Sequence, residues 1–292
     1  MAPRTSFDAI LSIFDDSVAK GLVKYTTPKT FRVEDGGFTF EFQISPALSK
    51  KPQDGDPISG HEHGSEKPEC FGPGSDIAVD HPSLLITTVR DTHLLVVNKF
   101  CISRPQLLLL TRDSYRRQWE PLGLEDLAAA CTVLGSLDHD LYVIYNCGPM
   151  AGSSRRHKHL QVLPRPGQLF PDSQGVSGAV PYRYFLRYLN DVDLGSSDGQ
   201  TRLFEIYSSL LAEAKKSLGD NLDNDGYIPH NVALVKEWII VIPRRNGAFE
   251  DITANTAGML GSVWMANEEE IDRWKQVGPK RVLAGLSVPG NF

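Results

Sequence analysis

Two histidines and a glutamine alternate along one short stretch of the chain, at His157, His159 and Gln161. The pattern around them predicts a strand over residues 157–163, in which successive side chains point to opposite faces. The two imidazoles and the amide therefore share one face. The opposite face carries Lys158, Leu160 and Val162. Packing against an apolar core does not explain why three polar side chains share one face, so the row indicates a chemical site.

The chemistry that suits this row is group transfer through a histidine. A neutral imidazole is a good nucleophile at pH 7, and the phosphoramidate that it forms is labile enough to pass the group on. Either imidazole is a candidate nucleophile, and the neighbouring histidine and a backbone carbonyl could fix which ring nitrogen is free to attack. The NH₂ group of Gln161 suits a non-bridging phosphate oxygen on which charge builds. The row therefore predicts a site for phosphoryl chemistry.

A loop of small residues directly precedes the row. It contains Gly148, Ala151, Gly152, Ser153 and Ser154. Because these side chains are small, backbone N–H groups can approach phosphate oxygens closely, and the two hydroxyls add donors. Basic clusters stand out in a chain that is acidic overall, and they comprise Lys50, Lys51, Arg155, Arg156, Lys158 and Arg165. The loop is therefore a candidate phosphate cradle.

Other interpretations of these residues stay open at this point. Paired histidines on a strand can bind zinc, although no third ligand is obvious nearby. They can also be hydrogen-bonded histidines of the core, and the small-residue loop alone can be an ordinary hairpin connection. A further pair, His61 and His63, lies in a polar stretch, where we expect it to be solvated and without function.

Composition narrows the class of protein. The chain has 292 residues, 41% of them hydrophobic and 23% charged, as in globular proteins. It shows neither an apolar run long enough for a membrane span nor a secretory signal, so we expect no membrane partner. A net charge of −6 argues against a nucleic-acid surface. Four cysteines without a CxxC pair indicate reduced thiols and a cytoplasmic protein, with a nuclear location left open.

Hydrophobic periodicity predicts an α+β fold with an antiparallel sheet and flanking helices. We expect helices at residues 7–18, 124–137, 203–218, 257–265 and 268–283. We expect strands at residues 38–44, 84–90, 94–98, 106–111, 142–146, 157–163, 232–235 and 238–242. Residues 46–76 are predicted to form a long polar loop that could act as a lid. A polar stretch near residues 190–200 separates two packed halves, 1–190 and 191–292.

The segment GSSRRHKHLQ, residues 152–161, resembles the transferase branch of the histidine-triad superfamily. That branch includes galactose-1-phosphate uridylyltransferase and the diadenosine tetraphosphate phosphorylases, also called ATP adenylyltransferases. Gln161 stands where the hydrolase branch has a third histidine, and Lys158 stands where the uridylyltransferases usually have proline. The chain therefore looks most like the phosphorylases. The resemblance extends over SKKP, LLVVNKF, LLLLT, YIPHNVALVKEWIIVIPR, NTAGML and WKQVGPKRVLAGLSVP.

This resemblance implies a histidine-triad-like sheet, with the catalytic motif in region 1–190 and an ATP adenylyltransferase C-terminal region in 191–292. It implies that His159 is the nucleophile and that Gln161 holds the α-phosphate. Asn146 and Ser154 would orient the histidine or contact phosphate, with His157 completing the catalytic set. Substrate contacts are further expected from Lys51, Asn98, Lys99, Gly152, Ser153, Arg155, Thr253, Ala254 and Met259.

The implied reaction is the reversible phosphorolysis of diadenosine tetraphosphate (Ap4A), in which Ap4A and inorganic phosphate give ATP and ADP. We expect Mg²⁺ or Mn²⁺ to be carried by the polyphosphate with few protein ligands, and we expect no organic cofactor. Two halves in one chain favour a monomer. Two positions depart from the family pattern, which more often has glutamine at Arg155 and usually has lysine at Val263.

Three alternatives to this reaction remain. The chain could hydrolyse dinucleoside polyphosphates, or it could transfer a nucleotidyl group from another donor such as a sugar nucleotide. It could also be a catalytically silent sensor of dinucleotides. An intact His159 disfavours the sensor, because a protein that only binds has no need of a nucleophile.

Overall fold

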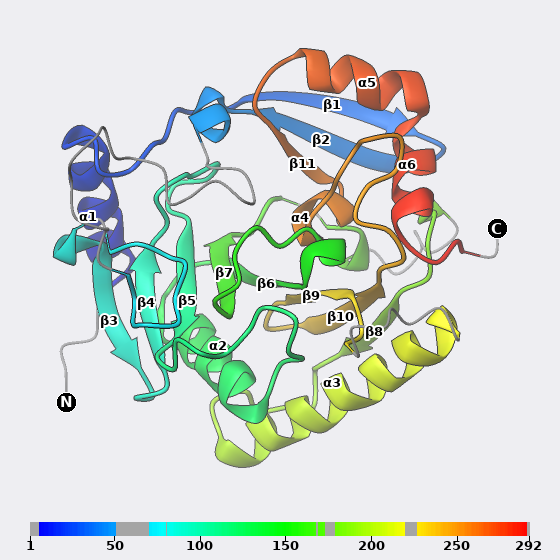
Figure 1. Ribbon diagram of the computed structural model, residues 1–292. Helices are drawn as coiled ribbons and strands as arrows, with labels where there is room; N and C mark the ends of the chain where they lie inside the picture. Colours follow the sequence, from blue (N-terminus) through cyan, green and yellow to red (C-terminus); the bar gives the residue numbers. More distant parts are fainter. Residues whose placement is uncertain are drawn as a thin grey trace.

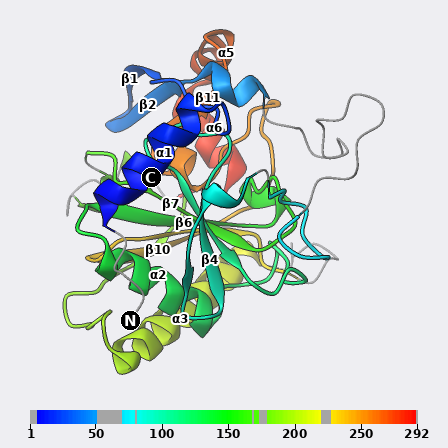
Figure 2. The same cartoon turned by 90° about the vertical axis from the view of Figure 1, so that its left-hand side faces the viewer.

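The computed structural model of the chain describes residues 6–50, 70–79, 81–167, 169–172, 179–219 and 227–290, except for the side chain of Lys50. Of the residues named above, Lys51, His61 and His63 lie outside the described residues. The described part has three layers: helices below a large sheet, and a small sheet with further helices above it (Figures 1 and 2). The predicted α+β class is confirmed.

The middle layer is an eight-stranded antiparallel sheet with the strand order β3-β4-β5-β7-β6-β9-β10-β8. Its strands are β3 (Leu85–Val89), β4 (His93–Val97), β5 (Leu107–Thr111), β6 (Leu141–Cys147), β7 (His159–Pro164), β8 (Phe185–Tyr188), β9 (His230–Leu234) and β10 (Trp238–Pro243). Side chains alternate between two hydrophobic cores, as a strand requires. On β6, Val143 and Tyr145 join the lower core, whereas Tyr142 and Ile144 join the upper core. Both faces of the sheet are therefore covered.

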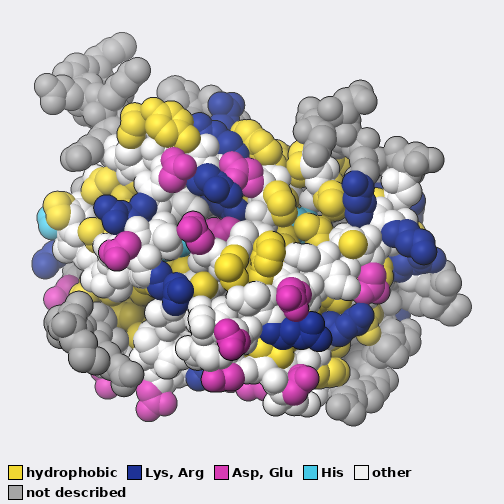
Figure 3. All heavy atoms as spheres, turned by 90° about the horizontal axis from the view of Figure 1, so that it is seen from below, with side chains coloured by type: hydrophobic (Ala, Val, Ile, Leu, Met, Phe, Trp, Pro, Cys, Tyr) yellow, Lys and Arg dark blue, Asp and Glu magenta, His cyan; other side chains and the backbone are white. Residues whose placement is uncertain are grey.

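The lower layer consists of α2 (Leu124–Ser136) and α3 (Ser197–Leu218), which run beneath the sheet (Figure 1). Both helices are amphipathic, with stripes that include Leu127 and Leu210 buried against the sheet. Helix α1 (Phe7–Ala19) lies at the β3 end, near the short 3₁₀ helix η2 (Pro82–Leu84), and adds Phe14 to the same core. Seen from below, acidic and basic side chains are interspersed over this side of the molecule (Figure 3).

The upper layer contains a three-stranded sheet. Strand β2 (Phe38–Ile44) pairs antiparallel with β1 (Lys29–Asp35) and parallel with β11 (Ser262–Met265). The helices of this layer are α4 (Thr256–Met259), α5 (Glu269–Val277) and α6 (Pro279–Leu286). The remaining short 3₁₀ helices are η1 (Pro46–Lys50), η3 (Pro149–Ala151) and η4 (Phe170–Asp172). Helix α4 touches β6 and β9, so the upper layer reaches the strands at the centre of the large sheet.

Strands of the two halves pair at three places, β6 with β9, β8 with β10 and β2 with β11, and the first of these lies at the centre of the large sheet. Strand β6 pairs with β9 over five residues, from Val143↔Leu234 to Cys147↔His230. The large sheet therefore runs without interruption from strands of the first half to strands of the second (Figure 1). In consequence, polar side chains from both halves can meet at the Cys147 end of this pair.

Several sequence expectations were wrong in detail. A helix was expected at residues 257–265, but α4 ends at Met259 and β11 follows. Gly261 explains the change, because it has φ +96° and a Cβ on it would lie 2.6 Å from the carbonyl oxygen of Thr39. The helix expected at residues 268–283 divides at Gly278, which has φ +93° and precedes the first residue of α6.

Besides β11, two further strands lie where the sequence analysis expected no element. Strand β1 exposes most of its residues, and β8 has no buried residue, so neither shows the alternating pattern of a half-buried strand. The strand expected at residues 157–163 begins only at His159. Within the described ranges, no helix is long and apolar enough to cross a membrane. All four cysteines are free, and burial raises the pKa of Cys131 and of Cys147 to about 12.

Candidate active site

The candidate nucleophile opens strand β7 at the centre of the sheet. His159 pairs with Leu110 of β5, and its side chain is 8% exposed. Its Nδ1 lies 2.7 Å from the backbone carbonyl oxygen of His157. Since a carbonyl only accepts hydrogen bonds, Nδ1 carries the proton and donates it, which leaves the lone pair on Nε2. The backbone carbonyl, and not the neighbouring imidazole, thus selects the nitrogen that can attack phosphorus.

His157 serves the site through its backbone. Its ring is buried, with Nε2 lying 3.0 Å from Thr111 Oγ1 and 2.9 Å from the Thr111 carbonyl oxygen, and Nδ1 lying 2.8 Å from Ser75 Oγ. Its N–H donates to Asp76 Oδ1 at 2.9 Å. Burial lowers the pKa of His157, which favours a neutral ring at neutral pH. These contacts fix the peptide whose carbonyl holds His159.

Gln161 presents its amide in one defined orientation. Gln106 Nε2 donates to Gln161 Oε1 at 2.8 Å, and Gln106 Oε1 accepts from the N–H of Ile102 at 2.9 Å. A backbone N–H only donates, so the oxygen of Gln106 must face it and its nitrogen must face Gln161. The half-buried amide of Gln161 therefore turns its oxygen to Gln106 and leaves its NH₂ group as the donor that the sequence predicted.

A residue that the sequence did not single out holds the nucleophile in place. Pairing of β6 with β7 ends at Ile144↔Gln161, and beyond it the side chain of Gln118 lies between the two strands. Its Oε1 accepts from the N–H of His159 at 2.8 Å. Its Nε2 donates at 3.0 Å to the carbonyl oxygens of both His159 and Asn146. The buried amide of Gln118 thus bonds both strands as a backbone peptide would.

The small-residue loop bends back against the second half of the chain. Gly148 has φ +80°, and a Cβ there would lie 2.4 Å from the Tyr227 ring. Gly152 has φ +84°, and a Cβ there would lie 2.9 Å from the Ala254 carbonyl oxygen. Both positions therefore require glycine for conformation and for space. The residues that follow, Ser153, Ser154 and Arg155, are partly exposed.

Lys158 faces away from this site. Its ammonium is fully buried and donates to Asp126 Oδ2 at 2.6 Å and to the Pro121 carbonyl oxygen at 2.8 Å. The other oxygen of Asp126 lies 3.0 Å from His93 Nε2. Burial disfavours ionisation of Asp126, but the hydrogen bond from His93 and the charge of Lys158 outweigh it and lower its pKa to about 2. The charge of Lys158 is thus compensated behind the nucleophile.

The other predicted contact residues lie at varying places around the site. The N–H of Asn98 donates to the Gln106 carbonyl oxygen at 2.9 Å, so the start of this segment adjoins the Gln106–Gln161 pair. Lys99 Nζ lies 5.8 Å from the centroid of the Phe100 ring. Ala254 contacts the loop at Gly152, and the neighbouring Thr253 is exposed. Met259 and Val263 are buried in the upper core, so their side chains are packed among apolar neighbours.

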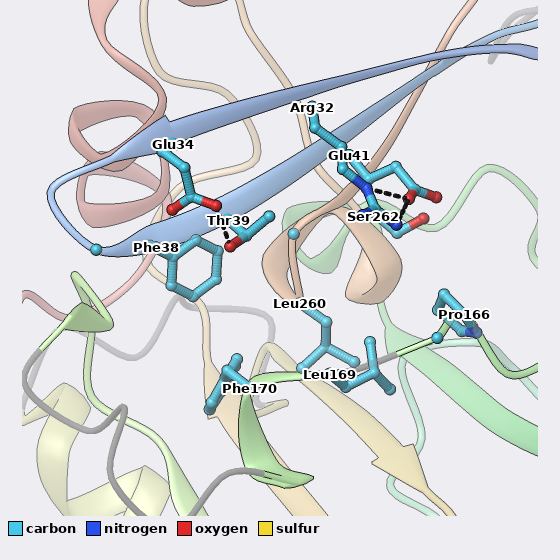
Figure 4. A pocket seen from close by; sticks show the side chains of 13 residues that line it. Arg32, Glu34, Phe38, Thr39, Glu41, Pro166, Leu169, Phe170, Leu260 and Ser262 are labelled. Atoms are coloured by element: carbon cyan, nitrogen blue, oxygen red, sulfur yellow. Dashed lines mark hydrogen bonds and ion pairs between the residues drawn. The ribbon is translucent and has the colours of Figure 1, made fainter.

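A separate pocket of about 360 Å³ opens between the small sheet and the segment after β7 (Figure 4). None of the predicted site residues lines it. Its charged residues are Arg32, Glu34 and Glu41, of which Arg32 and Glu41 form an ion pair at 3.4 Å. One cation against two carboxylates does not favour the binding of a polyphosphate in this pocket.

Among the described residues, no group of three or more His, Cys, Asp or Glu side chains could hold a metal ion. The imidazole of His157 is taken up by Thr111 and Ser75, so the zinc interpretation of the paired histidines gains no support.

Comparisons with known proteins identify the family of the chain. Residues 1–176 match the family model of the Ap4A phosphorylase N-terminal domain, and residues 178–289 match that of the ATP adenylyltransferase C-terminal domain. These matches define a nucleotidyltransferase. The chain belongs to the Ap4A phosphorylase family, as its motif predicted.

Relatives in Saccharomyces cerevisiae (strain ATCC 204508 / S288c) support the assignment. Protein APA1 is 27% identical over 297 residues, which cover 90% of this chain and 86% of that protein. Diadenosine 5′,5‴-P1,P4-tetraphosphate phosphorylase 2 is 25% identical over 287 residues, which cover 86% of this chain and 84% of that protein.

Solved structures share the fold. The yeast Ap4A phosphorylase Apa2 superimposes with a TM-score of 0.72 at 22% identity, covering 97% of this chain and 94% of that one. The same yeast enzyme in complex with Ap4A gives a TM-score of 0.75 at 22% identity, covering 97% of each chain.

Proposed function

We propose that the chain catalyses the reversible phosphorolysis of Ap4A to ATP and ADP through an adenylyl group carried on His159. The observation that carries the proposal is the 2.7 Å contact from His159 Nδ1 to the His157 carbonyl oxygen, which leaves Nε2 as the nucleophilic nitrogen. Membership of the Ap4A phosphorylase family and the likeness to a yeast enzyme solved with Ap4A support the substrate.

Two displacements make up the reaction. In the first, Nε2 of His159 bonds to an α-phosphorus of Ap4A, the bridging P–O bond breaks, and ATP departs with the bonding electrons. In the second, an oxygen of inorganic phosphate bonds to the same phosphorus, the P–N bond breaks, and ADP forms. The imidazole regains its lone pair, so atoms and charge balance over the cycle. Such a double displacement replaces one difficult step with two easier ones.

The surrounding groups would stabilise the charge that develops on the phosphoryl oxygens. Gln161 supplies an NH₂ donor beside the nucleophile. The N–H groups of Gly152 and Ser153 already donate to the carbonyl oxygens of Pro149 and Gly148, so the Ser153 hydroxyl is the group that this part of the loop offers to the polyphosphate. Ser154 and Arg155 extend the donor set at the partly exposed end of the loop. Mg²⁺ or Mn²⁺ bound to the polyphosphate would neutralise part of its charge.

We propose a monomer, because the pairing of β6 with β9 places strands of both halves side by side within one chain. Light scattering on the purified protein tests this part. A stable dimer would contradict it.

Product analysis tests the activity. Purified protein is incubated with Ap4A and Mg²⁺, with and without phosphate, and the nucleotides are separated by chromatography. We expect ATP and ADP only when phosphate is present. ATP and AMP without phosphate would identify a hydrolase, and turnover of a sugar nucleotide alone would identify a different transferase. Tight binding of Ap4A without products would identify a sensor.

A further inference from the structure

A buried polar network joins the two halves beside the nucleophile. Asn146 lies at the end of β6, opposite Asn231 at the start of β9. The Oδ1 atom of Asn146 accepts from Asn231 Nδ2 at 3.0 Å and from the N–H of Thr256 at 2.8 Å. Thr256 Oγ1 lies 2.7 Å from the same oxygen and shares its one proton between it and the Tyr145 carbonyl oxygen at 2.9 Å. The side chains of Asn146, Asn231 and Thr256 are buried. The oxygen end of the Asn146 amide is therefore fully engaged.

The backbone settles which way this amide points. The N–H of Thr256 can only donate, so it must face the oxygen of Asn146 and not the nitrogen. The NH₂ group of Asn146 then lies on the opposite side of the amide, and no described residue hydrogen-bonds to it. Because Gln118 bonds the backbone of Asn146 and of His159, this NH₂ group is carried beside the nucleophile.

A buried arginine fixes the second amide. Arg244, which follows β10 directly, is 1% exposed, and its Nη1 donates at 2.7 Å to both Asn231 Oδ1 and the Ala254 carbonyl oxygen. Its Nε donates to the Leu286 carbonyl oxygen at 3.2 Å. A guanidinium only donates, so the oxygen of Asn231 must face Arg244 and its NH₂ group must face Asn146.

Arg244 has an unusual partner set for a buried cation. Its hydrogen bonds to described residues all go to neutral oxygens, and no carboxylate of those residues lies within ion-pair distance of it. Burial lowers the pKa of Arg244 to about 9, so it remains protonated at neutral pH. A buried charge without a counter-charge is costly, which calls for a role beyond packing.

We propose that Arg244 and Asn231 are positioning residues that orient Asn146 as a hydrogen-bond donor to the polyphosphate of the substrate. Arg244 fixes the orientation of the Asn231 amide. Asn231 and Thr256 together fix the orientation of the Asn146 amide. The second half of the chain thereby controls a phosphate contact made by the first half. The proposal rests on the proposed function for the identity of the substrate, although any nucleoside polyphosphate bound beside His159 would meet the same donor.

The decisive variant is Asn146→Asp. It is nearly isosteric and keeps the oxygen that accepts from Asn231 and Thr256, so we expect the fold and its melting temperature to be retained. It replaces the NH₂ donor by an acceptor, so we expect the KM for Ap4A and the Kd for ATP, measured by calorimetry, to rise about 30-fold or more. Unchanged values of both would overturn the proposal.

A matched pair of variants at Arg244 separates positioning from packing. Arg244→Gln keeps an amide N–H that can donate to Asn231, whereas Arg244→Met keeps the bulk and no donor. We expect both to lower the melting temperature, but we expect KM to rise about tenfold for Met and only about threefold for Gln. Arg165→Met is the control, because Arg165 is a largely buried arginine that pairs with Asp172 and Glu237 and lies outside the network.

The outcomes distinguish this proposal from the proposed function. Equal KM values in both Arg244 variants and the wild type, together with lowered melting temperatures, would mean a purely structural arginine. If the wild type binds ATP but does not phosphorolyse Ap4A, the proposed function fails, and the Kd series still decides the positioning. If the wild type binds neither nucleotide, both proposals are overturned.

Discussion

The large sheet contains two neighbouring antiparallel hairpins, β6–β7 and β9–β10, which differ in the side chains they carry and in the length of their connections. On the face toward the upper layer, β7 carries His159 and Gln161, whereas β10 carries Trp238, Ile240 and Ile242. Strand β10 follows β9 through the short turn 235–237, whereas residues 148–158 separate β7 from β6. The proposed nucleophile thus belongs to the hairpin with the longer connection, which is the candidate phosphate cradle.

The second hairpin contributes at its ends instead. Asn231 is the second residue of β9 and Arg244 follows β10, while the strand interiors between them are apolar and buried. A rigid hairpin holds such terminal residues in place, because its own side chains are locked by packing. The comparison teaches that a reactive hairpin can rely on an inert neighbour for its orientation.

The variant expected to have the largest effect is His159→Ala in the β6–β7 hairpin. Loss of the nucleophile removes the covalent route, so we expect phosphorolysis of Ap4A to fall by about 10⁴-fold or more. The measurement is the rate of ATP and ADP formation, with mass spectrometry of the trapped protein to detect adenylylation. Ile240→Val in the inert hairpin is the control, and we expect it to retain activity at a stability cost of about 1 kcal/mol. Retained turnover in His159→Ala would refute the assignment of the nucleophile.

Lys158→Met tests the reverse face of the reactive hairpin. It leaves the Asp126 carboxylate buried without its cation, so we expect the free energy of unfolding in urea to fall by about 3–5 kcal/mol. Replacing both partners, with Asp126→Leu added, should recover part of the loss, because no lone charge then remains. Since Lys158 faces away from the site, the folded fraction should keep its KM. An unchanged stability would show that this ion pair is dispensable.

The smallest expected effect concerns His230, at the start of the inert hairpin. Burial lowers its pKa from 6.5 to about 4, and its ring is held by Ile228 and Tyr207. As the pH falls, the unfolded chain binds a proton near pH 6.5, whereas the folded chain does so only near pH 4. The contribution of His230 to the free energy of unfolding is therefore complete above pH 6.5. It is lost as the pH falls from 6.5 to about 4, by up to about 1.4 kcal/mol per pH unit.

The measurement is the free energy of unfolding between pH 7.5 and about 4.5, for the wild type and for His230→Gln. We expect the difference between the two chains to shrink as the pH falls. A constant difference would mean that His230 titrates alike in the folded and unfolded states.

The sequence predicted the reactive face better than its supports. Period-two alternation correctly placed His159 and Gln161 on one face and Lys158 on the other, because a strand leaves no other choice. It could not show that Asp126 would compensate Lys158, since that contact depends on how α2 packs. The tautomer of His159 also depends on a carbonyl, which sequence cannot orient.

The supporting residues illustrate the limit most clearly. Gln118 is one of several polar residues in its loop, and no periodic pattern in the sequence distinguishes it from the others. Asn231 and Arg244 did leave a trace, because each is a polar residue bordering a strongly apolar strand, where burial needs a partner. The topology that joins them to Asn146 comes from the pairing of β6 with β9, which lies outside the reach of local patterns.

The same pairing has a consequence for how such a protein can change over generations. Two identical chains that meet along a strand must carry every substitution twice, once on each side of the symmetry axis. Here β6 and β9 are encoded separately, so a histidine acquired in one hairpin imposes nothing on the other. In a single gene, substitutions around His159 on the β6–β7 side of this pair and around Arg244 on the β9–β10 side can therefore accumulate independently of each other.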